Sequence, residues 1–371
     1  MSTVKPGWVE DLLAGRLHLA VLKSRLVVEL RLRAKGAVLP GKGVEPGTPL
    51  KMAFKVRLPD VGEEVPVLLA TSLKGALRAI SERLAKGDCK AFASLRAEEE
   101  AIYWHHEPEG GPVRHAPRKR EPGKKPGREG GPIPEKGEQE DIFREEDLRR
   151  LLNVLGISSL GPEKTLKLAI LLGITREEAE ELGGEVRKSG TLGRLSLADR
   201  RVGRLVSDLV ERALALFCPI CRLYGSPSLA AKLRLVDALP VNATRTAMRI
   251  HVGIDRRSLT SAENILYQEE VVEPGAVFRA YLIADNVEPG TPEAKLLAST
   301  LEFIHKLGLQ VGGSKSRGLG LLRVDEEASK VWFCDFTEAR GSLALEMLLD
   351  PRKGHKMKLE KLVEFLRAGR S

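Results

Sequence analysis

Residues 292–324 read PEAKLLASTLEFIHKLGLQVGGSKSRGLGLLRV, and this stretch decides the fold of the chain around it. Apolar side chains recur at a helical period from 292 to 307, and residues 319–324 have the apolar content of a strand. Between them, residues 308–320 hold five glycines, two serines, Lys315 and Arg317. The stretch therefore predicts a helix, a basic glycine loop (residues 308–320) and a strand, in that order.

The glycine loop has the composition of an anion site. Glycine lets the backbone adopt positive φ and approach a ligand closely, while the two cations supply charge for a phosphate. Nucleotide-binding loops run from strand to helix with GxxxxGK[ST] spacing, whereas this loop runs from helix to strand and places Ser314 before Lys315. A mononucleotide site is therefore disfavoured. A polymer lying across a sheet fits better, and a flexible basic connection without a ligand stays as the alternative.

The composition favours a polyanionic partner. The chain of 371 residues is 42% hydrophobic and 30% charged, as expected of a globular protein with roughly two or three core-forming units. Lys and Arg exceed Asp and Glu by 60 to 51, a net charge of +9 that suits nucleic acid. Aromatic residues make up only 4%, so contacts to an RNA or DNA backbone are expected rather than base stacking.

Two further expectations concern the source and the compartment. The chain has only four Asn and three Gln beside abundant Glu, Lys and Arg, which is typical of a thermophilic protein. No apolar run approaches the length of a membrane span, and the first residues lack the apolar core of a signal peptide. A cytoplasmic location is therefore expected.

Strands and helices are predicted on both sides of the glycine loop. Alternation over 27–32 predicts an amphipathic first strand, and capping residues begin a helix at 71–84 that carries Lys74 and Arg78 on one face. Residues 141–217 have helical patterns and follow a basic Gly/Pro-rich segment at 108–137 that is expected to be mobile. Strand patterns return at 233–236, 249–254 and 276–284, and helical patterns close the chain at 338–349 and 356–368. The fold class is α+β.

Four stretches, in this order, resemble motifs of the RAMP proteins of CRISPR systems. Residues 71–78 (TSLKGALR) resemble their SSLKGxxR segment, and residues 218–226 (CPICRLYGS) resemble their CxxCxxFG segment. Residues 253–263 (GIDRRSLTSAE) are similar to the IDRxTxxA element, which the E-x-V-x-x-G pattern follows at 270–275. The glycine loop is similar to their terminal GGxxSRGxG. Together these stretches most resemble the Csm-type backbone subunit of the type III-A interference complex, with its methanogen form as one variant.

The resemblance implies a modified ferredoxin-like core, in the style of RNA-recognition domains, at 16–85 and 218–335. Within this core it implies a lid loop at about 36–66 and a hairpin thumb at about 240–273. Residues 86–217 are then an insertion with the basic loop and a helical domain, and residues 336–371 a C-terminal helical extension.

The resemblance also implies partners and binding residues. The protein would polymerise along a CRISPR guide RNA in antiviral defence, meet complementary target RNA, and contact other copies of itself and other type III-A subunits. Carried over residue by residue, the RNA contacts are expected at Lys74, Arg78, Arg256, Arg257, Gly312, Gly313, Ser314, Lys315, Ser316 and Arg317.

This role requires no catalytic residue, and a RAMP endoribonuclease is the alternative. Family members that slice target RNA use an aspartate in the loop after the first strand, where residues 35–54 offer only Glu45 as an acid, and Asp60 follows later. Magnesium is expected only if the chain is such a slicer. A repeat-processing enzyme would use a histidine base, and no histidine lies in the helix predicted at 71–84.

A structural zinc site is predicted from the cysteines. Cys218 and Cys221 supply half of a tetrahedral site, and Cys89 with His105 or His106 completes a Cys3His set. The spacing does not choose between the two histidines. Ordinary buried thiols and surface imidazoles are the alternative. Three other histidines lie in predicted strands or helices and are expected to be packing residues, namely His18, His251 and His305. Cys334 is expected in the core.

Overall fold

The computed structural model describes residues 21–44, 50–58, 62–87, 153, 157–171, 174–196, 200–226, 229–254, 261–337, 339 and 341–368. The chain divides into two compact units, of which the first combines residues 1–21 with 89–231 and the second combines 22–88 with 232–371. The sequence put the end of the insertion at 217, whereas the first compact unit continues to Ala231. The chain passes between the units at 21–22, 88–89 and 231–232.

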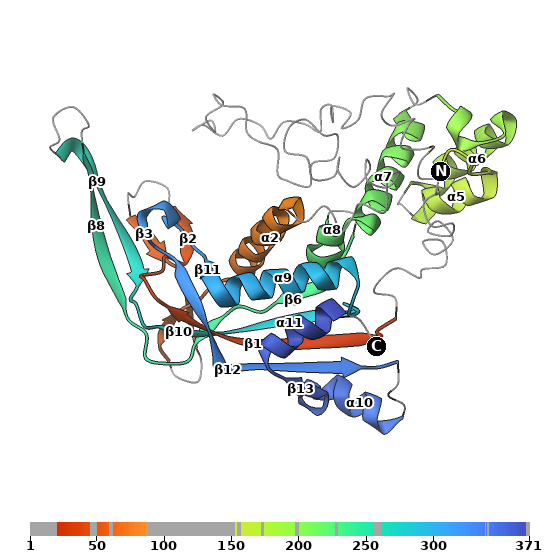
Figure 1. Ribbon diagram of the computed structural model, residues 1–371. Coiled ribbons are helices and arrows are strands. Elements are labelled where there is room, and N and C mark those ends of the chain that lie inside the picture. Colours follow the sequence, from red (N-terminus) through yellow and green to blue (C-terminus); the bar gives the residue numbers. More distant parts are fainter. Residues whose placement is uncertain are drawn as a thin grey trace. The chain divides into compact units, whose positions relative to one another are not determined.

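The second unit is built on an antiparallel sheet with β1 (Ser24–Ala34) at its centre (Figure 1). β1 pairs with β12 (Leu321–Asp335) on one side and with β10 (Val277–Asp285) on the other, and β10 pairs with β6 (Leu233–Leu235). Three short strands extend this sheet: β7 (Leu239–Pro240), β11 (Leu309–Gln310) and β13 (His355–Met357).

Two helices complete a ferredoxin-like arrangement. α2 (Ala70–Gly87) follows β1, and α9 (Pro292–Leu307) follows β10. The chain order β1–α2–β6–β10–α9–β12, with the sheet order β12-β1-β10-β6, is the split βαβ topology. The helices pack on each other closely enough for the hydroxyls of Ser81 and Thr300 to lie 2.7 Å apart. The α+β prediction is confirmed.

The local sequence explains the bounds of α9, which agree with the prediction. Thr291 caps its first turn through a hydrogen bond from the N–H of Ala294 at 3.4 Å, and Pro292 occupies the first position, where no N–H is needed. Gly308 ends the helix with φ +87°.

The prediction that β1 is amphipathic is confirmed. Leu26, Leu30 and Leu32 lie on one face and are at most 2% exposed, whereas the alternate residues are largely polar and include the exposed Arg33. Glu29 lies on this polar face but is only 6% exposed, and its carboxylate accepts hydrogen bonds from Arg31 at 2.6 Å and from the Tyr281 hydroxyl at 3.2 Å. The sequence pattern did not predict the burial of Glu29, which depends on contacts with the neighbouring strands.

A second, four-stranded sheet carries a long hairpin. Its order is β2 (Gly41–Val44), β3 (Leu50–Ala53), β9 (Ser261–Val272) and β8 (Thr246–Ile254). The β8–β9 hairpin projects from the second unit (Figure 1). A small ribbon of β4 (Lys55–Arg57) and β5 (Glu64–Pro66) lies between β3 and α2 in the chain.

The first unit is helical where it is described. It contains α5 (Pro162–Leu171), α6 (Arg176–Ser189), α7 (Arg200–Phe217), α8 (Pro219–Tyr224) and a 3-10 turn η2 (Leu192–Arg194). The Oγ1 of Thr175 caps α6 by accepting from the N–H of Glu178 at 3.3 Å. In the part of the chain that the structure describes, no helix is long and apolar enough to cross a membrane.

The chain ends in a C-terminal extension of the second unit: α10 (Ser342–Leu349), a 3-10 turn η4 (Pro351–Lys353), β13 and α11 (Leu359–Ala368). α11 packs on α9 and β12. Its apolar face is buried through Leu359, Leu362, Val363 and Leu366.

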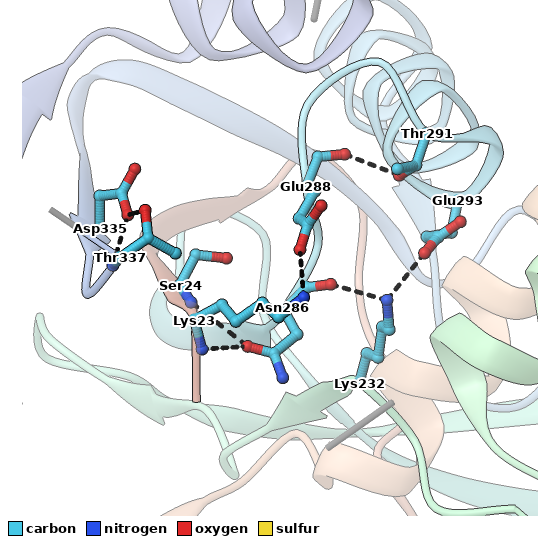
Figure 2. A network of polar contacts seen from close by, with 9 residues as sticks. All are labelled: Lys23, Ser24, Lys232, Asn286, Glu288, Thr291, Glu293, Asp335 and Thr337. Atoms are coloured by element: carbon cyan, nitrogen blue, oxygen red, sulfur yellow. Dashed lines mark hydrogen bonds and ion pairs between the residues drawn. The ribbon is translucent and has the colours of Figure 1, made fainter. Parts of the chain in front are cut away.

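A buried polar network fixes the places where two segments join the second unit (Figure 2). The ammonium group of Lys232, 4% exposed, donates to Glu293 Oε1 at 2.7 Å and to the carbonyl of Asn286 at 2.6 Å. The side-chain oxygen of Asn286 accepts from the N–H groups of Lys23 at 2.7 Å and Ser24 at 3.2 Å. In the sequence, Lys23 comes just after the passage between units at 21–22, and Lys232 just after the passage at 231–232. The network therefore holds both segments where they join the sheet.

Candidate nucleic-acid interface

The glycine loop is anchored on the second unit rather than projecting freely from it. It leads from Gly308 through β11 and a 3-10 turn η3 (Lys315–Arg317) into β12. The N–H of Gly313 donates to the carbonyl of Leu39 at 3.0 Å, in the segment that follows β1. Beneath the loop lies a small buried apolar cluster of Ala37, Leu39, Val271 and Leu319. The loop is therefore held against the segment that follows β1.

Two glycines are required by this packing. Gly312 has φ +80°, and a Cβ at this position would overlap the carbonyl group of Leu39. Gly320 has φ +89°, and a Cβ there would overlap the carbonyl group of Val311. Only glycine combines this backbone conformation with so little space. These two glycines therefore allow the loop to pack tightly on the backbone of Leu39 and Val311. The sequence had indicated only that glycines would let the loop approach a ligand.

The fixed point beneath the loop is the carboxylate of Glu269, on β9, whose side chain is 0% exposed. Its Oε1 accepts hydrogen bonds from the Ser314 hydroxyl at 2.7 Å, from Lys51 Nζ at 3.0 Å and from Arg317 Nη1 at 3.3 Å. Ser314 has the left-handed conformation, with φ +54°. One buried acid thus ties two residues of the glycine loop to β3 and β9.

A second buried acid, Glu270, ties the other face of β9 to β3 and β4. It accepts from the Thr246 hydroxyl at 2.8 Å, from the Ala53 N–H at 3.2 Å and from Lys55. Burial alone would raise the pKa of each of these carboxyls, but the hydrogen bonds and charges around Glu269 and Glu270 hold the pKa of both below the usual value. Both are therefore ionised at neutral pH and act as fixed anions.

His251 belongs to this cluster, and the prediction that it is a packing residue is wrong. Its Nε2 lies 3.2 Å from Glu269 Oε2, and its side chain is 22% exposed. Sequence reasoning also missed Glu269 and Lys51. The available signal was the pair of acids before Val271 and Val272, because charged residues within an apolar strand need partners.

The loop turns its cations toward solvent. Lys315 and Ser316 are exposed, and the Arg317 side chain is 43% exposed although it contacts Glu269. Among the described residues, the N–H groups of Gly312, Ser314, Lys315 and Ser316 find no hydrogen-bond acceptor. N–H groups of this kind, beside two cations, can bind an anion by donating hydrogen bonds to it. Because the loop is anchored, these groups hold their positions before an anion arrives.

Lys74 and Arg78 lie on α2, which packs against β11 at the beginning of the loop. Lys74 is half-buried, and burial lowers its pKa, to which the neighbouring charge of Arg78 adds. Arg78 donates to Glu82 at 2.8 Å in an i,i+4 ion pair. A nearby phosphate would favour the charged form of Lys74, because it would supply the counter-charge that burial removes.

The other predicted binding residues, Arg256 and Arg257, lie outside the described residues, between β8 and β9 in the sequence. The hairpin itself exposes an apolar row on β8, with Met248, Ile250 and Val252 at 48%, 62% and 51% exposure. Alternate residues of a strand share a face, so these three side chains form one surface.

Cys218 and Cys221 form a local pair in the first unit. Both thiols are buried, and the Sγ of Cys218 caps α8 by accepting from the Cys221 N–H at 3.4 Å. The other predicted zinc ligands, Cys89, His105 and His106, lie outside the described residues, as does His18. Cys334 is buried in the second unit, as expected.

Comparison with protein families connects these features. The model of the RAMP superfamily matches residues 48–323, which include α2, the β8–β9 hairpin and the whole glycine loop. The C-terminal extension lies beyond the match. No curated protein matches the chain.

Proposed function

Because the chain belongs to the RAMP superfamily, we propose that it is a CRISPR-associated RNA-binding protein whose glycine loop grips the backbone of single-stranded RNA. More specifically, we propose a backbone subunit of a type III-A ribonucleoprotein in the cytoplasm. It would bind the guide RNA largely independently of sequence, assemble as a filament, and present the guide to complementary target RNA in antiviral defence.

The observation that carries this proposal is the glycine loop anchored by Glu269. Arg317 uses Nη1 to hold Glu269, but a guanidinium has five N–H donors and this side chain is 43% exposed, so it can also meet a phosphate. Lys315 is exposed and holds no acid among the described side chains. The loop therefore resembles a preset cradle in which Lys315 supplies the charge and Arg317 both positions the loop and contacts RNA.

The remaining contacts follow the path from α2 to the loop. Lys74 and Arg78 would add charge beside β11, and Arg256 and Arg257 would add charge from the segment between β8 and β9. Gly312, Ser314 and Ser316 would present their backbone N–H groups to the same RNA strand, and Ser316 its hydroxyl as well. Gly313, whose own N–H is held by Leu39, would allow the RNA backbone to approach closely. Contacts of this kind bind the phosphates and sugars of RNA rather than its bases, which agrees with binding that is largely independent of base sequence.

The β8–β9 hairpin is the proposed thumb, and the segment from β2 to β5 is the proposed lid. The exposed apolar row on β8 supports a role in contact with another molecule, because neighbouring apolar side chains that face solvent together are typical of interaction surfaces. Other copies of the chain and other type III-A subunits are the proposed protein partners.

We also propose structural zinc in the first unit, bound by Cys218 and Cys221 with Cys89 and either His105 or His106. The described pair fits such a site, since both thiols are buried within one turn and the N–H of Cys221 donates to Cys218, as second-layer donors do around metal thiolates. Zinc analysis of the purified protein tests this, and far less than one equivalent would contradict it.

The RNA proposal is tested by single-stranded RNA binding of a Lys315→Ala/Arg317→Ala variant at fixed salt. The expected result is a loss of affinity of about tenfold to a hundredfold, because each phosphate contact contributes of the order of 1 kcal/mol. The matched control is Lys356→Ala/Lys358→Ala, which removes the same charge from exposed residues of the C-terminal extension.

The comparison between the two variants is decisive. If both lose affinity equally, the effect is one of net charge, and the glycine loop is not the grip. If the loop variant binds as tightly as the parent, the proposal fails outright.

His251 supports a second candidate, a RAMP endoribonuclease. An imidazole held by a buried carboxylate beside a phosphate-binding loop could act as a general base without a metal. The acids that could serve a metal-dependent slicer, Glu45 and Asp60, lie outside the described residues.

Cleavage assays separate these activities. Repeat-containing RNA and guide-matched target RNA are incubated with the parent and with His251→Ala, with Mg²⁺ or with EDTA. One cut in the repeat that persists in EDTA and disappears in His251→Ala supports the processing enzyme. Regularly spaced cuts in target RNA that need Mg²⁺ support the slicer, and intact RNA throughout supports binding alone.

A further inference from the structure

Three ligand-type side chains from separate elements of the second unit meet at one point. They are His305 near the end of α9, Glu326 on β12 and Glu360 in the first turn of α11. One ligand atom from each lies within 4.8 Å of the other two, and His305 Nε2 is 3.0 Å from Glu326 Oε2. The prediction that His305 is a packing residue is therefore wrong, since its side chain is 24% exposed and faces an acid.

The contact between α9 and α11 carries different charges at its other end. There Glu302 of α9 pairs with Lys306 at 2.6 Å and with Arg367 of α11, and these two hydrogen-bond donors lower the pKa of Glu302 to about 2. Across the described ranges, neither Glu326 nor Glu360 pairs with a Lys or Arg side chain. Two carboxylates therefore lie beside one imidazole. Among the described side chains, no Lys or Arg balances their charge in the way that Lys306 and Arg367 balance the charge of Glu302.

We propose that His305, Glu326 and Glu360 bind one divalent transition-metal ion, which fastens α11 to α9 and β12. One imidazole nitrogen and two carboxylate oxygens are donors that Zn²⁺ accepts at about 2.0 to 2.2 Å, which requires only small shifts from the present spacing. Three protein ligands leave a position for water. The partial exposure of His305 and Glu326 gives the ion a path from solvent.

The site would serve a part of the chain that the family match does not include. Glu326 and Glu360 both lie beyond residue 323, where the match ends, and only His305 lies within it. α11 buries a single apolar face on the core. A metal between its first turn and the sheet would hold the beginning of the helix, as Arg367 and Glu302 hold its end. This proposal is independent of the RNA-binding function and of the cysteine site in the first unit.

Hydrogen exchange of the full chain, stripped of metal and then supplied with Zn²⁺, tests the proposal. Amides of residues 359–368 are expected to exchange about tenfold more slowly when free Zn²⁺ is about ten times its Kd, because the ion binds only the docked helix. The readout is local, so Zn²⁺ taken up by cysteines in the first unit does not imitate it.

Two variants remove ligands, and one serves as a control. Glu360→Gln keeps the size of an exposed side chain, and His305→Ala removes the nitrogen ligand; both are expected to lose the protection by Zn²⁺. His355→Ala removes an exposed histidine of β13 outside the cluster and is expected to keep it. Equal protection in the two ligand variants, no protection in the parent, or equal protection by Mg²⁺ would each overturn the assignment.

Discussion

The carboxylate of Glu269 is fully buried, and the Ser314 hydroxyl, Lys51 and Arg317 all approach the same oxygen. A buried charge is tolerated only where its partners replace the lost water, and here two of the partners are partly exposed cations, Lys51 and Arg317. The residue therefore stabilises the fold and sets the conformation of the glycine loop. Its removal is expected to affect both properties.

Glu269→Gln is expected to lower the free energy of unfolding by about 1.5 to 3 kcal/mol, the range for hydrogen bonds to charged groups. The cations left behind are partly exposed, so the larger cost of a fully buried orphan charge does not apply. Denaturant unfolding measures the change. Glu273→Gln, an exposed acid just after β9, is the control and should change stability little.

The same residue predicts a pH dependence. The pKa of Glu269 is lower in the folded chain than its usual value of 4.5, so the unfolded chain binds the proton more readily. Its contribution is complete above about pH 4.5 and is lost as pH falls through the lower, folded pKa. Stability of the parent should therefore decline with acidification in this window. The decline should be shallower in Glu269→Gln, and an identical slope would contradict the assignment.

At the scale of elements, the glycine loop offers a matched pair of substitutions. Gly318 and Gly320 have similar backbone angles, φ +81° and +89°, but a Cβ on Gly318 meets open space and one on Gly320 overlaps Val311. Gly318→Ala is expected to cost about 1 to 2 kcal/mol from the left-handed conformation alone. Gly320→Ala is expected to cost about 1 to 3 kcal/mol more, because the backbone must move.

Unfolding and RNA affinity of the two variants measure this difference together. Gly320→Ala should also weaken RNA binding, since the loop loses its anchored form. Equal effects of the two substitutions would show that space around Gly320 does not constrain the loop.

The ion pair between Lys232, before β6, and Glu293, in the first turn of α9, joins two elements in the core (Figure 2). Both side chains are buried, at 4% and 0% exposure. Lys232→Met alone is expected to cost about 3 to 5 kcal/mol, because it removes the cationic partner of a buried carboxylate. The double variant with Glu293→Leu should recover a substantial part of that loss. A double-mutant cycle by denaturant unfolding measures the coupling, and additive losses would contradict it.

At the scale of the whole molecule, the net charge of +9 and the exposed cations predict a strong salt dependence of RNA binding. The logarithm of the binding constant should fall linearly with the logarithm of salt concentration, with a slope of about 0.7 per phosphate contact on a single strand. Lys315→Ala/Arg317→Ala should therefore reduce the slope by about 1.4, if each cation meets one phosphate. Titrations at several salt concentrations give the slopes, and an unchanged slope in the variant would argue against phosphate contact by these residues.

The agreement between sequence and structure is best where local signals dominate. The bounds of α9 follow from a capping threonine, a first-position proline and a terminal glycine, each within a residue or two of the helix end that it sets. The start of α2 at Ala70 also lies within one residue of the predicted start at 71. The burial of Glu29 and the pairing of His251 with Glu269 were not predicted, because both depend on strand pairing that one strand's pattern does not reveal.

The sequence by itself determined the α+β class, the order of helix, glycine loop and strand, the family, and the identity of the exposed cations. These features depend on periodicity, composition and local spacing, which a chain carries without folding. Only the tertiary structure decided that the loop is fastened by Glu269, that Gly312 and Gly320 serve packing, and that His305 meets Glu326 and Glu360. Such contacts join separate elements of the chain, and a buried charge reveals its partners only when the strands and helices that carry them are brought together.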